Sequence, residues 1–198
     1  LLFSVPMILA SVFQQMYNAV DSIIVGQFVG ANALAAVGAA FPAMFLAMSV
    51  LIGITMGVQI IISQLFGAGE HERMRATFAT SIISLMILVV IASVIGYFAS
   101  GTILELMNTP PEIIADSKAY LDEIFKGLIF MFLYNLYTSV LRGVGDSKTP
   151  LYFLIISSIL NIVLDLVYVI QFGMGVRGVA VATVQSQAVS VILCIIYT

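Results

Sequence analysis

The feature that most constrains this chain is residues 76–99, a stretch that contains no charged side chain. About 20 apolar residues in succession are enough to carry an α-helix across the hydrocarbon core of a bilayer. Charged residues make up 9% of the whole chain and hydrophobic residues 62%, whereas a soluble domain usually carries about 25% charged residues. A surface so poor in charge predicts that lipid is the solvent and that the chain is an all-α polytopic membrane protein.

Other stretches of the chain have the same apolar character, and short polar or glycine-containing segments separate them. We expect a single transmembrane lobe over residues 1–198, with six transmembrane helices at approximately 4–26, 33–66, 76–99, 118–141, 150–172 and 178–198. The second span is too long for one straight crossing. It must therefore tilt, kink near Gly53 and Gly57, or protrude from the membrane.

The basic residues predict the orientation of these helices. The two loops on one side of the membrane carry Arg73, Arg75, Arg142 and Lys148, and the opposite side carries Lys118, Lys126 and Arg177. The positive-inside rule then places both termini in the cytoplasm, in a multi-pass protein of the cell membrane. The net charge is -3 and no basic run occurs, so nucleic acid is not an expected partner.

Two acids lie within spans that contain no other charged residue. A charge at the centre of a membrane helix costs about 2.5–3.5 kcal/mol on insertion scales, so intramembrane acids usually have a function. Asp165 lies within the fifth span and Asp21 within the first, and neither has a basic residue in its own span. Asn161 lies four residues before Asp165, and Tyr17 four residues before Asp21, so each shares a helix face with its acid.

Thr183 and Gln187 form a third pair at this spacing, on the sixth span. If the first, fifth and sixth spans pack together, two carboxylates, an amide and a hydroxyl would converge. Such oxygen groups suit Na⁺, whereas a pair of desolvated carboxylates could instead share a proton. The alternative is that each acid is neutral and only forms hydrogen bonds inside the bundle. We also expect the hydroxyl of Tyr17 to donate to the Asp21 carboxylate.

Further polar residues are weaker candidates. Gln15, Asn135 and Gln187 are candidates for lining a cavity, and hydrogen bonding between helices is the alternative for them. Pro6 lies near the start of the first span, where it either bends the helix or simply begins it.

Several motifs carry a family resemblance. The chain contains, in this order, QMYNAVD at 15–21, ALAAVG at 33–38, QLFGAG at 64–69, LRGVGDSKTP at 141–150, NIVLD at 161–165 and GVAVAT at 178–183. Together these motifs resemble the multidrug and toxic compound extrusion (MATE) family.

The resemblance implies one half of a twelve-helix transporter, in which two six-helix lobes surround a central cavity. Such proteins export small organic cations and other amphiphiles in exchange for Na⁺ or H⁺, with no cofactor besides the coupling ion, and are not enzymes. Carried over by position, the coupling site of the N-terminal lobe consists of Asp21, Asp165, Asn161, Thr183 and Tyr17, with Asp21, Asn161, Asp165 and Thr183 as the Na⁺ ligands if sodium drives transport. Pro6 matches a bend-forming proline.

The chain ends after six helices, so either a second six-helix lobe lies outside this sequence or two copies pair. Three other functions remain open. The first is a lipid-linked oligosaccharide flippase of the same superfamily, although its phosphates would favour a basic cavity. The others are a membrane scaffold without transport and an intramembrane aspartic protease, which the Gly143–Asp146 segment imitates.

Overall fold

The computed structural model describes residues 4–197, which form six long helices and no strand. This confirms the predicted all-α fold. The helices are α1 (Ser4–Ile24), α2 (Ala31–Gly67), α3 (His71–Leu106), α4 (Pro111–Gly143), α5 (Lys148–Leu166) and α6 (Gly175–Tyr197). α1 and α5 each continue into a short π-helical segment, η1 (Val25–Val29) and η2 (Val167–Gln171) respectively.

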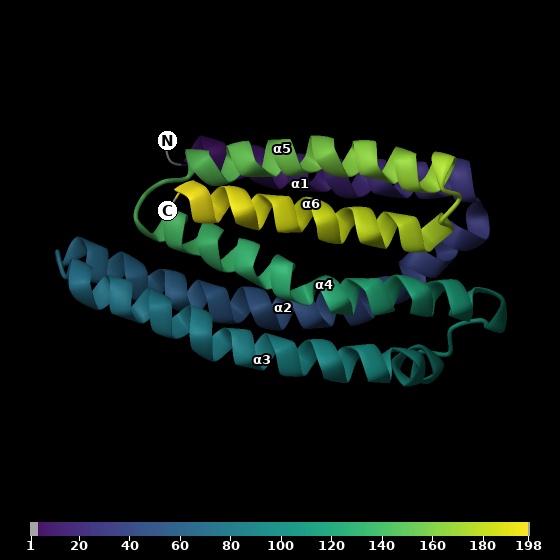
Figure 1. Ribbon diagram of the computed structural model, residues 1–198, viewed down its shortest axis with the longest axis horizontal. Coiled ribbons are helices and arrows are strands. Elements are labelled where there is room, and N and C mark those ends of the chain that lie inside the picture. The colour runs from purple at the N-terminus through teal and green to yellow at the C-terminus, as the bar shows by residue number, and fades with distance from the viewer. Residues whose placement is uncertain (1–3, 198) are drawn as a thin grey trace.

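α4 lies at the centre of the bundle. It packs against α2, α3 and α6, while α5 packs against α1 and α6. Figure 1 shows α1, α5 and α6 on one side of α4 and the α2–α3 hairpin on the other. The core runs along α4, where Leu121, Leu128, Phe132 and Leu136 are at most 1% exposed.

The outer surface of the bundle is apolar. Phe98 is 79% exposed, Leu106 78% and Ile196 77%. Large exposed apolar surfaces on soluble proteins are unusual, so these side chains suit a lipid environment. Within the described residues 4–197, five helical stretches are long and apolar enough to cross a membrane: α2, α3, α4, Lys148–Gln171 and α6.

α1 is not among those five, although the sequence predicts a span at 4–26. Its 21 residues include Gln14, Gln15, Asn18 and Asp21, and these polar side chains lower its mean hydropathy. α1 can still lie in the membrane because it is not alone there: it packs against α5.

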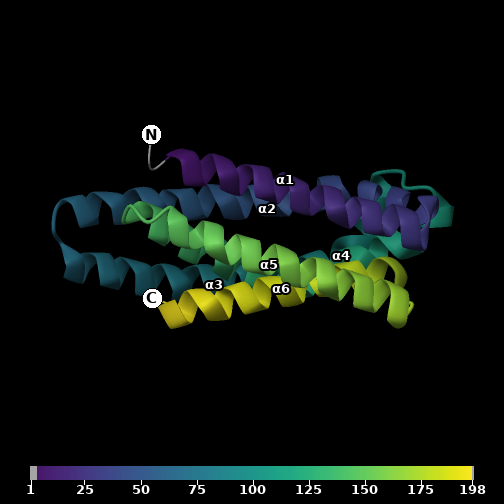
Figure 2. The same cartoon turned by 90° about the horizontal axis from the view of Figure 1, so that it is seen from above.

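α2 continues as one helix through Gly53, Gly57 and Pro42. Its 37 residues correspond to about 55 Å of helix, well beyond a hydrocarbon core of about 30 Å. Figures 1 and 2 show the α2–α3 hairpin extending past the other helices at the end of the bundle that holds both termini. Of the alternatives that the length of this span allows, the shape of the bundle favours protrusion.

Candidate functional site

The packing of α1 against α5, and of α5 against α6, brings four of the predicted site residues together. Asp165 and Asn161 on α5 are fully buried, and Thr183 on α6 is 8% exposed. Asp21 on α1 is half-buried. We call Asp21 and Asp165 the acid pair.

Asn161 connects the acid pair to α6. In the amide orientation that satisfies its neighbours, Asn161 Nδ2 lies 2.8 Å from Asp21 Oδ1 and 3.2 Å from Asp165 Oδ2. Its Oδ1 then accepts from the backbone N–H of Thr183 at 3.3 Å. One amide therefore links three helices, and the two carboxyl groups are themselves close enough to share a hydrogen bond.

Tyr17 joins the same cluster, but not as the sequence predicted. Its hydroxyl donates to Thr183 Oγ1 at 3.3 Å, and not to the Asp21 carboxylate. The prediction considered only the neighbour on the same helix, whereas the buried ring of Tyr17 reaches across to α6. Tyr17 still lies near enough to Asp21 and Asp165 for an electrostatic interaction.

No described basic side chain pairs with these acids. The ion pairs between described side chains are Arg73–Glu70, Arg75–Glu72, Lys118–Asp122, Lys126–Glu123 and Arg177–Glu123. Asp165 Oδ1 is also a buried acceptor to which no described group donates. Since a buried charge is costly without a partner, the acid pair needs a proton or a cation to be neutral.

The cluster fits either a proton or Na⁺. As described, the Asn161 amide donates to both carboxylates, which suits a pair that shares a proton. If the amide turns by half a rotation, its oxygen faces the same two carboxylates, and Thr183 Oγ1 could complete an oxygen set of the kind that hard cations prefer. Among residues 4–197, no three histidine, cysteine or acidic side chains gather as ligands for a metal ion, so an ion here would depend on the amide and hydroxyl oxygens.

Sequence reasoning missed Tyr120. This α4 residue is 6% exposed and lies close enough to both members of the acid pair to interact with them electrostatically. It stands at the very start of the predicted span 118–141, among polar residues, whereas α4 begins at Pro111. The longer helix places Tyr120 inside the bundle and makes α4 the fourth helix around the acid pair.

The remaining predicted residues lie elsewhere in the bundle. Asn135 donates to the carbonyl of Met131 on its own helix at 2.8 Å. Pro6 lies in the first turn of the described part of α1 and is buried. Gln187 shares the α6 face of Thr183, one turn away, and its Oε1 is buried without a partner among the described residues.

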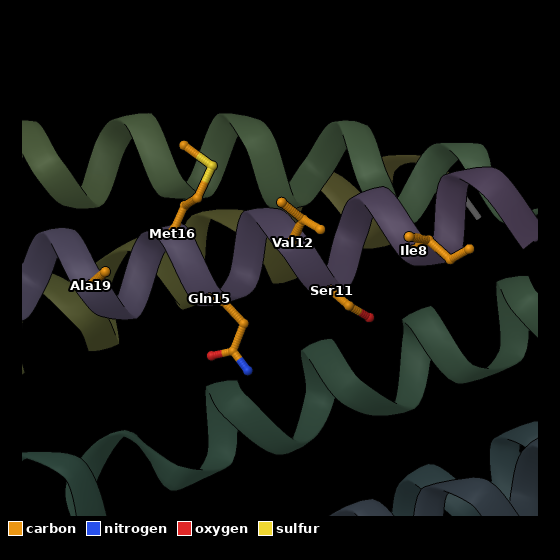
Figure 3. Close-up of a pocket in the computed structure, with 6 residues that line it drawn as sticks. All are labelled: Ile8, Ser11, Val12, Gln15, Met16 and Ala19. Atoms are coloured by element: carbon orange, nitrogen blue, oxygen red, sulfur yellow. The ribbon is translucent and has the colours of Figure 1, made fainter.

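Gln15 lies on the exposed side of α1, beside a shallow groove. The groove has a volume of about 510 Å³ and is lined by Ile8, Ser11, Val12, Gln15, Met16 and Ala19. Figure 3 shows Gln15 and Ser11 projecting to one side of α1 and Met16 to the other. The groove is therefore a feature of this one helix and is separate from the acid pair.

The Gly143–Asp146 segment forms a helix cap. Asp146 Oδ1 accepts from the backbone N–H groups of Lys148 and Thr149, both at 3.0 Å, and its Oδ2 accepts from the Tyr197 hydroxyl at 3.2 Å. Partial burial acts to raise the pKa of Asp146, but the hydrogen bonds from Thr149, Lys148 and Tyr197 outweigh it and lower the pKa. Both oxygens of the ionised Asp146 carboxylate already accept hydrogen bonds. This carboxylate is therefore poorly suited to share a proton with a second acid, as a protease dyad requires.

Comparison with known proteins identifies relatives of the whole described bundle. The family model described as MatE matches residues 6–167. The probable multidrug resistance protein YoeA of Bacillus subtilis is 41% identical over 99% of this chain, and the multidrug export protein MepA of Staphylococcus saprophyticus is 28% identical over 98%. In both cases the chain spans 43% of the relative's length.

Solved structures give the same result for the fold. One described as MATE in the bent conformation has a TM-score of 0.89 at 30% identity, and covers 98% of this chain and 43% of its own. A MOP superfamily transporter from Pyrococcus furiosus has a TM-score of 0.92 at 28% identity, with the same coverage. That protein is described as having a binding pocket of reverse polarity that suggests a different function.

Proposed function

Because this chain belongs to the MatE family, the multidrug and toxic compound extrusion transporters, we propose that it forms the N-terminal six-helix lobe of an antiporter that exports small organic cations in exchange for Na⁺ or H⁺. The chain covers less than half of its relatives, so the proposal includes a second six-helix lobe that completes the transporter. The protein would lie in the cell membrane with both ends of this segment in the cytoplasm.

The single observation that carries the proposal is the bridge from Asn161 to Asp21 and Asp165. It holds two acids from different helices against each other in a bundle that otherwise buries few charges. Two unit charges about 4 Å apart repel by about 4 kcal/mol at an effective dielectric constant near 20. Loading one H⁺ or Na⁺ removes most of that repulsion, and losing the ion restores it.

This change in repulsion gives a means of coupling. Asp21 is on α1, whereas Asp165 is on α5, which packs against both α1 and α6. Repulsion in the empty state favours a conformation in which α1 moves away from α5, and the loaded state favours the packed arrangement. An ion that stabilises one of two conformations shifts their populations, which is the requirement for exchange with a second ligand.

The charge of the acid pair also supports the class of cargo. A flippase for phosphate-bearing lipids would need cationic groups to hold the phosphates, whereas the described ionisable groups closest to this centre are acids and tyrosines. An acidic interior attracts organic cations.

The test is ethidium efflux from cells that express the complete protein, with wild type compared with Asp165→Asn under imposed Na⁺ or H⁺ gradients. We expect efflux to collapse in the variant at equal expression, and the gradient that drives wild-type efflux to identify the ion. Asp116→Asn is the matched control, because Asp116 is an exposed acid of α4 and should tolerate the same change. Normal efflux by Asp165→Asn would reject the coupling role and leave a structural hydrogen bond in its place.

If even the wild type exports no ethidium under either gradient, the antiporter proposal fails for this cargo. The flippase and scaffold functions would then be favoured.

A further inference from the structure

The facing surfaces of α5 and α6 form a polar line that begins at the acid pair. Asn161 meets the backbone of Thr183 there. One turn further toward the termini, Ser157 Oγ donates to the carbonyl oxygen of Ser186 at 3.3 Å. Both serines are at most 3% exposed. We call this line of contacts the α5–α6 seam.

The α5–α6 seam extends to the end of the bundle that holds both termini. There Tyr197 on α6 donates to Asp146, which caps α5. At 1.5 Å per residue, Thr183 lies about 21 Å from Tyr197 but only about 12 Å from Gly175 at the opposite end of α6. The acid pair is therefore close to one end of the bundle, and the seam covers the longer distance to the other end.

Three buried oxygens of α5 and α6 have no partner among the described residues: Asp165 Oδ1, Gln187 Oε1 and Ser190 Oγ. Ser190 is 1% exposed and Asp165 is fully buried. Gln187 and Ser190 follow Thr183 on one face of α6, at successive spacings of four and three residues. The three oxygens therefore form a row and are not scattered.

Close packing of small residues explains the serines of a membrane helix pair, but it does not explain oxygens left without partners. Buried polar atoms are normally satisfied, and where protein groups do not satisfy them, an internal water molecule with about three hydrogen bonds usually does. Lipid chains offer no hydrogen bonds at all. The row of three oxygens thus points to ordered water between α5 and α6.

We propose that the α5–α6 seam holds a file of internal water molecules that connects Asp165 with the end of the bundle at Tyr197. The presence of the water follows from the seam itself, and only its use rests on the proposed function. For H⁺, the file relays the proton that Asp165 releases, and the carboxylate keeps the electron pair. For Na⁺, the file keeps the ion partly hydrated on the same route.

The test detects the water directly by X-ray hydroxyl-radical labelling of the complete protein in membranes, with mass spectrometry of the oxidised residues. Radicals formed from a trapped water oxidise a thiol beside it, and thiols are readily oxidised. We compare Ser190→Cys with Val191→Cys, both in a Cys194→Ala background. The two positions are adjacent and equally buried, at 1% and 4% exposure, but only position 190 lies on the seam.

We expect the thiol introduced at position 190 to be oxidised roughly tenfold faster than the one at position 191. Equal rates at the two positions would overturn the proposal. A second position on the seam gives an independent readout: Ser157→Cys in the same Cys194→Ala background, at an α5 position that is 3% exposed, should also be oxidised faster than the Val191→Cys thiol. Protection of the Ser157→Cys thiol to the level of that control would also overturn it.

Labelling requires no transport, so the two proposals fail separately. If Asp165→Asn exports ethidium normally, the coupling role falls while fast labelling at position 190 still establishes the water file. If labelling at position 190 is slow while Asp165→Asn abolishes efflux, the coupling site stands and the water file is rejected.

Discussion

Asn161 Nδ2 lies 2.8 Å from Asp21 Oδ1, which joins the fifth helix of the bundle to the first. The same amide reaches Asp165 and the backbone of Thr183, so its removal should disturb three helices at once.

Asn161→Leu keeps the size of the side chain but removes its donor and acceptor. We expect ion-driven efflux to fall at least as far as in Asp165→Asn, because two carboxylates lose a shared partner. Leaving buried groups unsatisfied should also lower the free energy of unfolding by about 1–3 kcal/mol. Efflux assays and thermal unfolding in detergent measure the two effects. Asn135→Leu is the control, since Asn135 bonds only within its own helix; an equal loss of efflux in both variants would contradict a special role for Asn161.

Tyr120→Phe removes one hydroxyl beside the acid pair and keeps the ring. The ring packing should survive, so we expect normal expression and unfolding temperature. The dependence of efflux on the driving ion should nevertheless shift, because the polar environment of Asp21 and Asp165 changes. Efflux as a function of Na⁺ concentration and pH measures this shift. Tyr152→Phe, at a position 59% exposed, should leave the curves unchanged, and identical curves for Tyr120→Phe would place Tyr120 outside the site.

Gly143→Ala tests the close contact of α4 with α2. A Cβ at position 143 would lie 3.2 Å from both Gln59 O and Ile62 Cγ2, so the two helices must separate slightly. We expect a loss of about 1–3 kcal/mol in the free energy of unfolding. Gly53→Ala is the matched control within α2, since no atom lies within 4 Å of its added Cβ and alanine favours helix. Equal unfolding temperatures for the two variants would show that α4 and α2 are not in close contact here.

The ionisation of Asp146 should make the stability of the protein depend on pH. Its folded-state pKa is lowered, so its contribution is fully present above the unfolded-state pKa of about 3.9. That contribution is lost as the pH falls through the lower, folded-state pKa. The stability difference between wild type and Asp146→Ala should therefore be constant near neutral pH and shrink in strong acid. Unfolding by denaturant across this pH range measures the stability difference. A difference that grows on acidification would contradict the lowered folded-state pKa of Asp146.

The sequence was sufficient for the all-α membrane fold, and it singled out most of the residues that the structure brings together at the acid pair, because the bilayer makes polar residues conspicuous. An uncharged apolar run such as 76–99 is compatible with few structures other than a membrane helix. An acid within such a helix usually has a function and is therefore a strong candidate for a site residue. The actual helix is longer, His71–Leu106, because helix formation continues past the apolar part into charged turns where hydropathy gives no signal.

What could not be predicted depends on contacts between helices. Helical spacing pairs Tyr17 with Asp21, but the tyrosine hydroxyl meets Thr183 instead, and no periodicity within α1 contains that information. Tyr120 was missed for a related reason. An aromatic residue near a helix start is ordinary in sequence, and only the crossing of α4 over the bundle brings it to the acid pair.

The α2–α3 hairpin gives this lobe a lever. Each arm is one continuous helix of about 55 Å, and the turn that joins them, residues 68–70, lies past the ends of the other helices (Figure 2). A rigid rod converts a small rotation at its base into a large displacement at its tip. A spin label or fluorophore at this turn would therefore magnify tilts of the lobe that are too small to follow beside the acid pair.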